Sequence, residues 1–126
     1  MASIALASAL SSCAGQNTSD PENVAERFYA AVAVRDGAGA CAQLTADTLS
    51  ELESQEESPC ARAVLKLKLS GARARRAEAY VTTARVEMDE GDRVFLDETP
   101  DGWRVAAAGC RPEPGEEAPQ DCELES

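Results

Sequence analysis

Apolar and polar residues alternate from Ala74 to Cys110, and this pattern constrains the fold more than any other. Successive side chains of a strand point to opposite faces, so alternation predicts strands with one apolar face. Short turn-forming stretches at residues 89–92 and 100–102 separate the runs and make consecutive strands neighbours. We therefore predict four antiparallel strands. The expected inward positions are Ala77, Ala79, Val81, Ala84, Val86, Met88, Val94, Leu96, Trp103, Val105 and Ala107.

A sheet with one apolar face needs a covering layer, and the N-terminal half of the chain is the candidate. Asp20 and Pro21 are typical of a helix start, with Asp20 as the capping residue. An apolar stripe at helical spacing follows, made of Val24, Phe28, Ala31 and Val32. Shorter helices should fill the chain up to Gly71. The predicted class is α+β, with N-terminal helices packed on the sheet.

The first thirteen residues read as an export signal that ends in a lipid attachment site. Residues 1–12 are apolar or small and uncharged, and they are too few to span a bilayer. Residues 10–13, Leu-Ser-Ser-Cys, resemble the bacterial lipobox, in which the cysteine receives diacylglycerol and becomes the new N-terminus. We therefore expect lipidation of Cys13 and a tether over residues 13–19. No Lys or Arg precedes the apolar run, so we expect a truncated signal whose true start lies upstream.

Charge and composition restrict the partners of such a chain. A lipid on Cys13 would hold the domain at the cell membrane, on its extracytoplasmic face. The net charge of −11 disfavours nucleic acid, so we expect none as a partner. The expected partners are the membrane, through Cys13, and an unknown envelope protein or small ligand. The chain has no histidine, which removes the commonest general base near neutral pH and the commonest metal ligand.

Four cysteines remain once Cys13 is assigned to lipid: Cys41, Cys60, Cys110 and Cys122. In an exported chain an even number of cysteines indicates disulfides. Three pairings are possible, and we favour Cys41–Cys60 with Cys110–Cys122 because each closes a short loop within one half of the chain. Zinc is the alternative, but there is no CxxC pair and no histidine to support it. We expect no metal and no cofactor.

The composition changes after Arg111, where proline, glycine and glutamate dominate. Such a segment cannot form a core of its own. Because Cys122 would tie it back, we expect a single domain over residues 20–122 and a frayed tail over residues 123–126.

Taken together, these features resemble small actinobacterial lipoproteins of unknown function with a nuclear-transport-factor-2-like (SnoaL-like) cone fold. The resemblance covers residues 21–122 and implies a curved, cone-like sheet crossed by the long helix. Besides the lipobox, the matching motifs are Ala25-Glu26-Arg27-Phe28-Tyr29-Ala30-Ala31, Cys41 with Leu44-Thr45, Cys60, Val94-Phe95-Leu96, Gly102-Trp103-Arg104-Val105, Ala108-Gly109-Cys110 and Asp121-Cys122.

Enzymatic members of that fold keep an acid–base pair, often Asp with His or Tyr, in a pocket between sheet and long helix. The candidates here are Asp36, Asp89, Asp97, Tyr29 and Tyr80. A general base must lie within hydrogen-bond reach of its proton, and nothing in the sequence places these residues together. We therefore predict no catalytic residue.

Two structural roles are possible for three aromatic residues. Phe28, Tyr29 and Trp103 either pack in the core, which we favour, or line a pocket. The expected function is that of an exported, membrane-anchored lipoprotein whose domain is a non-catalytic binding or accessory module in the cell envelope. The alternatives are a cone-fold hydrolase or isomerase, and a carrier of a small apolar ligand.

Overall fold

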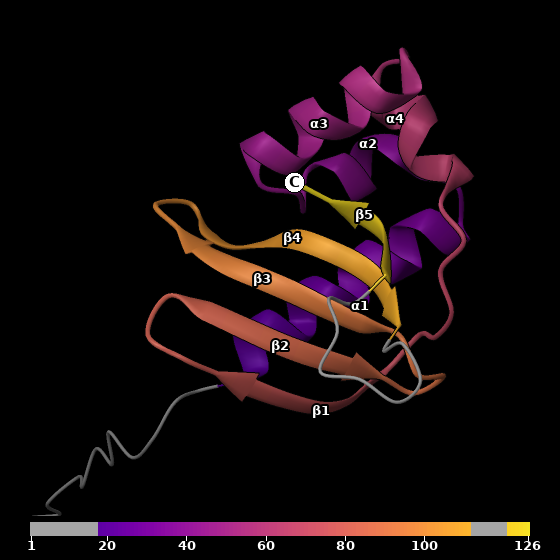
Figure 1. Ribbon diagram of the computed structural model, residues 1–126. Helices are drawn as coiled ribbons and strands as arrows, with labels where there is room; N and C mark the ends of the chain where they lie inside the picture. The colour runs from indigo at the N-terminus through magenta and orange to yellow at the C-terminus, as the bar shows by residue number, and fades with distance from the viewer. Residues whose placement is uncertain (1–17, 112–120) are drawn as a thin grey trace, which may run out of the picture.

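The computed structural model describes residues 18–111 and 121–126 and confirms the α+β class (Figure 1). Helices come first along the chain and strands follow. In order, the elements are α1 (Ser19–Ala33), α2 (Gly37–Cys41), α3 (Ala46–Glu56), α4 (Cys60–Ala63), the 3-10 helix η1 (Val64–Lys66), β1 (Ala74–Ala79), β2 (Thr83–Met88), β3 (Arg93–Thr99), β4 (Gly102–Arg111) and β5 (Asp121–Glu125).

The sheet has five antiparallel strands in the order β1-β2-β3-β4-β5, so the prediction of four strands is wrong. The added strand is β5, which pairs with β4 through Cys110 opposite Cys122 and Ala108 opposite Leu124. Leu124 is only 2% exposed. The frayed tail expected from residue 123 onward is therefore wrong as far as Glu125, because one apolar side chain and a cross-linked neighbour hold the segment in the sheet.

The alternation predicted for the sheet holds in β2 and β3 and changes phase within β4. Val105 is buried as expected, but Ala107 is partly exposed and Ala108 is buried. The register between β3 and β4 shifts on both sides of Phe95. Such an irregularity moves the following side chains to the opposite face, which is why the inward position assigned to Ala107 is wrong. Val81 is also outside the core, since it lies in the β1–β2 turn and is 83% exposed.

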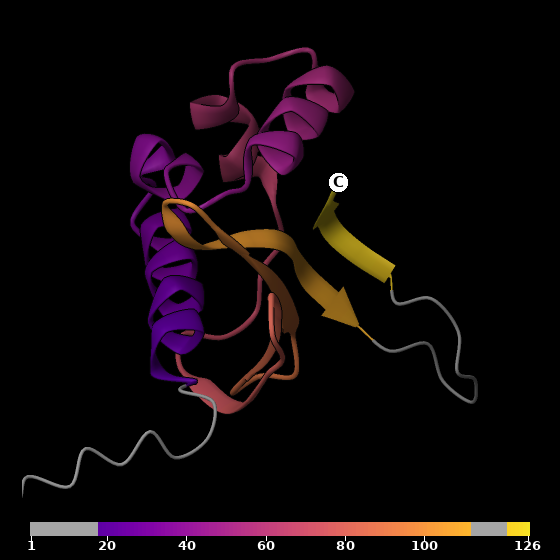
Figure 2. The ribbon, with the colours of Figure 1, turned by 90° about the vertical axis from the view of Figure 1, so that its left-hand side faces the viewer.

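Helix α1 lies along one face of the sheet. The shorter helices lie beside the edge of the sheet that β4 and β5 form (Figures 1 and 2). The helix begins at Ser19, so Ser19 is not tether and Asp20 lies in the first turn instead of capping it. The predicted stripe is rotated slightly around the helix. Ala31 and Val32 are only partly buried, while the buried side of α1 carries Pro21, Val24, Ala25, Phe28 and Tyr29.

Hydrogen bonds fix α3 to the sheet. The Thr45 hydroxyl caps this helix by accepting from the Thr48 N–H at 3.1 Å. The Thr48 hydroxyl in turn donates to the carbonyl of Ala106 in β4 at 2.9 Å. The Thr45 N–H donates to the carbonyl of Val105 at 3.0 Å. Helix α3 is therefore attached to β4 through its first turn.

The two predicted disulfides, Cys41–Cys60 and Cys110–Cys122, are both present. The first joins the end of α2 to the start of α4, and the second joins β4 to β5. Helices α2 and α4 approach so closely that a side chain on Gly37 would overlap the carbonyl oxygen of Ala61. A cross-link in each half of the chain suits a domain of this size, which buries only about two-thirds of its unfolded surface.

The central position of Phe28 can be tested with Phe28→Ala. Phe28 is fully buried between α1 and the sheet, so its truncation leaves a cavity and should lower the free energy of unfolding by about 3–5 kcal/mol. Urea denaturation of the oxidised protein measures this. Val34→Ala is the matched control, since Val34 is 75% exposed and should change little. Equal midpoints for the two variants would contradict the assignment of Phe28 to the core.

Replacing Cys110 and Cys122 together by serine tests the contribution of the second disulfide. The bond closes a loop with a sequence separation of 12, and its loss should cost about 2–4 kcal/mol of unfolding free energy. The same urea measurement under oxidising conditions checks this, with the parent protein as reference. A double variant as stable as the parent would show that β5 is held by its pairing alone.

Candidate functional site

A buried polar cluster lies where α1 meets the sheet, and Asp92 is at its centre. Asp92 ends the turn between β2 and β3, and its carbonyl accepts from the Met88 N–H at 2.8 Å. The turn bends back at Gly91, whose φ of +101° favours glycine. Asp92 is 0% exposed, so its carboxylate must find its partners within the protein.

The carboxylate of Asp92 receives hydrogen bonds from three segments of the chain. Oδ2 accepts from the Tyr29 hydroxyl at 3.1 Å and from the Ser70 N–H at 2.8 Å. Oδ1 pairs with Nε of Arg111 at 3.2 Å. The Tyr29 hydroxyl also accepts from the Gly109 N–H at 3.1 Å, so it is used both as a donor and as an acceptor.

Burial and charge keep the Tyr29 hydroxyl protonated. Burial is the larger cause that raises the pKa of Tyr29 far above its ordinary value, and the negative charge of Asp92 raises it further. Arg111 and the hydrogen bond from Gly109 lower the pKa of Tyr29, but by less. Near neutral pH this hydroxyl is therefore a hydrogen-bond donor to Asp92 and not an ionised base.

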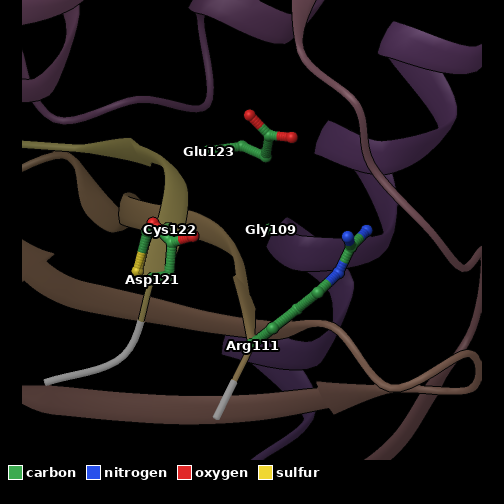
Figure 3. Close-up of a pocket in the computed structure, with 5 residues that line it drawn as sticks. All are labelled: Gly109, Arg111, Asp121, Cys122 and Glu123. Atoms are coloured by element: carbon green, nitrogen blue, oxygen red, sulfur yellow. The ribbon is translucent and has the colours of Figure 1, made fainter. Parts of the chain in front are cut away.

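A small polar cavity adjoins the cluster at the C-terminal end of β4 (Figure 3). Its volume is about 90 Å³. Arg111 extends from the end of β4 away from Asp121 and Cys122, and Glu123 projects from β5 beside the cavity (Figure 3). The space suits a few water molecules, whereas pockets for small organic ligands hold roughly 300–1,000 Å³.

The hydrogen-bonding groups of this cluster already have partners within the protein. A general base must accept a proton from a substrate, yet both oxygens of the Asp92 carboxylate already accept hydrogen bonds from the protein. The Tyr29 hydroxyl is engaged in the same way. The arrangement joins segments of the fold, and the adjoining cavity, lined by Gly109 and Arg111, is smaller than the usual pocket for an organic ligand.

The structure does not bring the other acid–base candidates to this cluster. Asp36 caps α2 by accepting from the Gly39 N–H at 2.9 Å. Asp89 accepts from the Ala72 N–H at 3.0 Å, and this bond is the main cause that lowers the pKa of Asp89. Asp97 is exposed, and Tyr80 is 55% exposed. Of the five candidates, only Tyr29 is in the buried cluster.

The three aromatic residues divide between the two roles considered for them. Phe28 and Tyr29 are buried members of the core, which confirms the core-packing interpretation for both. Trp103 packs against the core but also lines a surface depression of about 220 Å³ beside the start of α1, together with Asp20, Val24 and Arg27. Cys13, the predicted lipidation site, lies outside the described residues.

Sequence reasoning did not find Asp92, although it found Tyr29. The two residues are 63 positions apart, and Asp92 sits in a stretch that reads as an ordinary turn. No periodicity marks a turn carboxylate that faces inward. The available signal was indirect: a helix tyrosine next to buried Phe28 needs a polar partner for its hydroxyl.

The part of the chain that the structure describes contains neither a metal-binding cluster nor a membrane-spanning helix. Among residues 18–111 and 121–126, no group of three or more carboxylates or cysteines is arranged to hold a metal ion. Over that same part of the chain, no helix has the length and apolar character needed to cross a membrane.

The role of Tyr29 can be tested with Tyr29→Phe. The change leaves the Gly109 N–H without its acceptor and removes one donor from Asp92, so unfolding free energy should fall by about 1–3 kcal/mol at pH 7. Tyr80→Phe is the control at an exposed position. A Tyr29→Phe protein as stable as the Tyr80→Phe control at pH 7 would show that the buried hydroxyl contributes nothing.

The raised pKa of Tyr29 also predicts how stability depends on pH. Below about pH 10 the hydroxyl is protonated in both the folded and the unfolded chain. Above it, the unfolded chain loses this proton while the folded protein retains it, so stability falls as pH rises. Urea denaturation across the alkaline range should show a shallower fall for Tyr29→Phe than for the parent. Parallel curves would contradict the pKa assignment.

Comparisons of the chain with protein-family models, with curated proteins and with solved structures find no match. Function is therefore inferred from the residues and geometry described above.

Proposed function

We propose that this protein is an exported lipoprotein, held by a lipid on Cys13 at the extracytoplasmic face of the cell membrane. Its folded domain is a non-catalytic binding or accessory module of the cell envelope. The observation that carries the proposal is the pair of disulfides, which uses every cysteine except the one in the lipobox. Structural disulfides persist in oxidising compartments outside the cytoplasm.

The non-catalytic part of the proposal is supported by the Asp92 cluster. Tyr29 from the long helix and Asp92 from the β2–β3 turn are the residue types that the resemblance implies for an enzymatic cone fold. Their hydrogen-bonding groups are engaged within the protein, and the adjoining cavity is only about 90 Å³. These two facts favour a structural role for the pair over a hydrolase or isomerase.

The filled inner face of the sheet disfavours a carrier that encloses its ligand. Fully buried Phe28, Met88, Leu96 and Val105 occupy the space between α1 and the sheet. An enclosed carrier needs an apolar cavity of roughly 300 Å³ or more at such a place. The order of a long helix, short helices and an antiparallel sheet supports the resemblance to the nuclear-transport-factor-2-like cone fold, which we keep as part of the proposal.

Intact-mass measurement of the protein extracted from its native cells tests the anchor. We expect a chain that begins at Cys13 and carries the mass of a diacylglyceryl group, recovered in the membrane fraction. Cys13→Ser should abolish both the added mass and the membrane fractionation, while leaving the two disulfides intact. An unmodified chain in the cytosol with free thiols at Cys41 and Cys60 would refute the proposal.

A further inference from the structure

One end of the domain brings together the start of α1 and two turns of the sheet. Figure 1 places the first turn of α1 on the same side of the domain as the β1–β2 and β3–β4 turns. The Glu98 N–H donates to the carbonyl of Thr82 at 2.8 Å, which holds the β1–β2 turn against the end of β3. Asp20 and Trp103 line one depression, so the β3–β4 turn lies beside the start of α1. We call this the tether end.

The tether end carries exposed apolar side chains. Three large hydrophobic residues are strongly exposed in the described chain, and two of them, Tyr80 at 55% and Val81 at 83%, are consecutive in the β1–β2 turn. Tyr80 also borders a groove of about 360 Å³ that is lined by Phe95 and is more apolar than polar. Adjacent exposed apolar groups on a soluble domain indicate a contact surface.

The position of the anchor identifies what this surface meets. Ser19, the first residue of α1, is six residues after Cys13. A fully extended chain spans at most about 3.6 Å per residue, so α1 would start within about 20 Å of the lipidated residue. A domain held so close must turn its tether end toward the bilayer. This step rests on the proposed lipidation of Cys13.

We propose that the β1–β2 turn docks in the interfacial layer of the membrane that anchors the chain, through Tyr80 and Val81. Valine contributes an apolar side chain, and tyrosine is enriched at the lipid–water interface because its ring is apolar and its hydroxyl is polar. The Tyr80 hydroxyl donates to Glu78 at 2.9 Å, which keeps a polar group at the edge of the patch.

Charge determines which lipids favour this contact. Exposed carboxylates at the tether end include Asp97, Glu98 and Asp101, and the chain as a whole carries a net charge of −11. Anionic headgroups would repel such a surface. The docking is therefore apolar, strongest on zwitterionic lipid, and salt should strengthen it on anionic lipid by screening the repulsion.

The test uses the full chain coupled through the Cys13 thiol to a maleimide lipid in phosphatidylcholine vesicles. Two variants each add one tryptophan to the native Trp103. Val81→Trp places it in the turn, and Val34→Trp is the matched control at a residue that is 75% exposed, just past the other end of α1. Brominated acyl chains quench tryptophans that enter the bilayer. We expect quenching of the Val81→Trp protein to exceed that of the control by roughly twofold or more.

Equal quenching of the two variants would overturn the proposal. A second result would also overturn it. If bromine had no effect on the Val81→Trp protein, but its introduced indole became shielded from acrylamide as the surface density of protein increased, the turn would be contacting a second copy of the chain. Quenching that requires anionic lipid and disappears in salt would contradict the apolar mechanism. The synthetic linkage replaces the biological lipid, so the outcome stands apart from the mass measurement on Cys13.

Discussion

The buried carboxylate of Asp92 is the interaction on which the arrangement of the domain depends. It joins α1 through Tyr29, the segment before β1 through Ser70, and the end of β4 through Arg111. A buried charge costs several kcal/mol unless its partners are in place, so these segments must reach their positions together. The apolar contacts around Phe28 supply the burial, but this carboxylate specifies how helix and sheet are oriented.

Polar interactions of a different kind define the sheet. Cross-strand neighbours carry opposite charges, with Glu87 between Arg76 at 3.8 Å and Arg93 at 3.5 Å, and Glu78 paired with Arg85 at 3.1 Å. Pairs at or near the surface contribute only about 0–1 kcal/mol each, and these range from partly to largely exposed. Their value is in register, because a slip by one residue would separate these opposite charges and expose apolar side chains.

Much of the fold was predictable because its signals are local. Alternation and short turns defined β1 to β4, and the stripe with Val24 and Phe28 defined α1. The pairing of the cysteines was predictable from short loops within each half of the chain. The phase of β4 was not, since an irregularity beside Phe95 depends on how β3 and β4 meet. Strand β5 was missed because a proline- and glutamate-rich stretch precedes it.

The candidate site was the least predictable part of the molecule. Tyr29 was identified as a polar aromatic residue on the long helix, but its partner Asp92 is distant in sequence and lies in a turn. One sequence carries no signal for a contact that exists only after helix and sheet have packed. The same limitation applies to Ser70 and Arg111, which look like a loop residue and a strand end.

The last strand also determines how the sheet meets other chains. An uncovered β4 would present a ten-residue row of backbone donors and acceptors to any extended segment nearby. Strand β5 pairs with the second half of that row, from Ala107 to Arg111, and its charged side chains are Asp121, Glu123 and Glu125. Repulsion between these negatively charged edge strands would keep crowded copies from pairing edge to edge into fibrous aggregates.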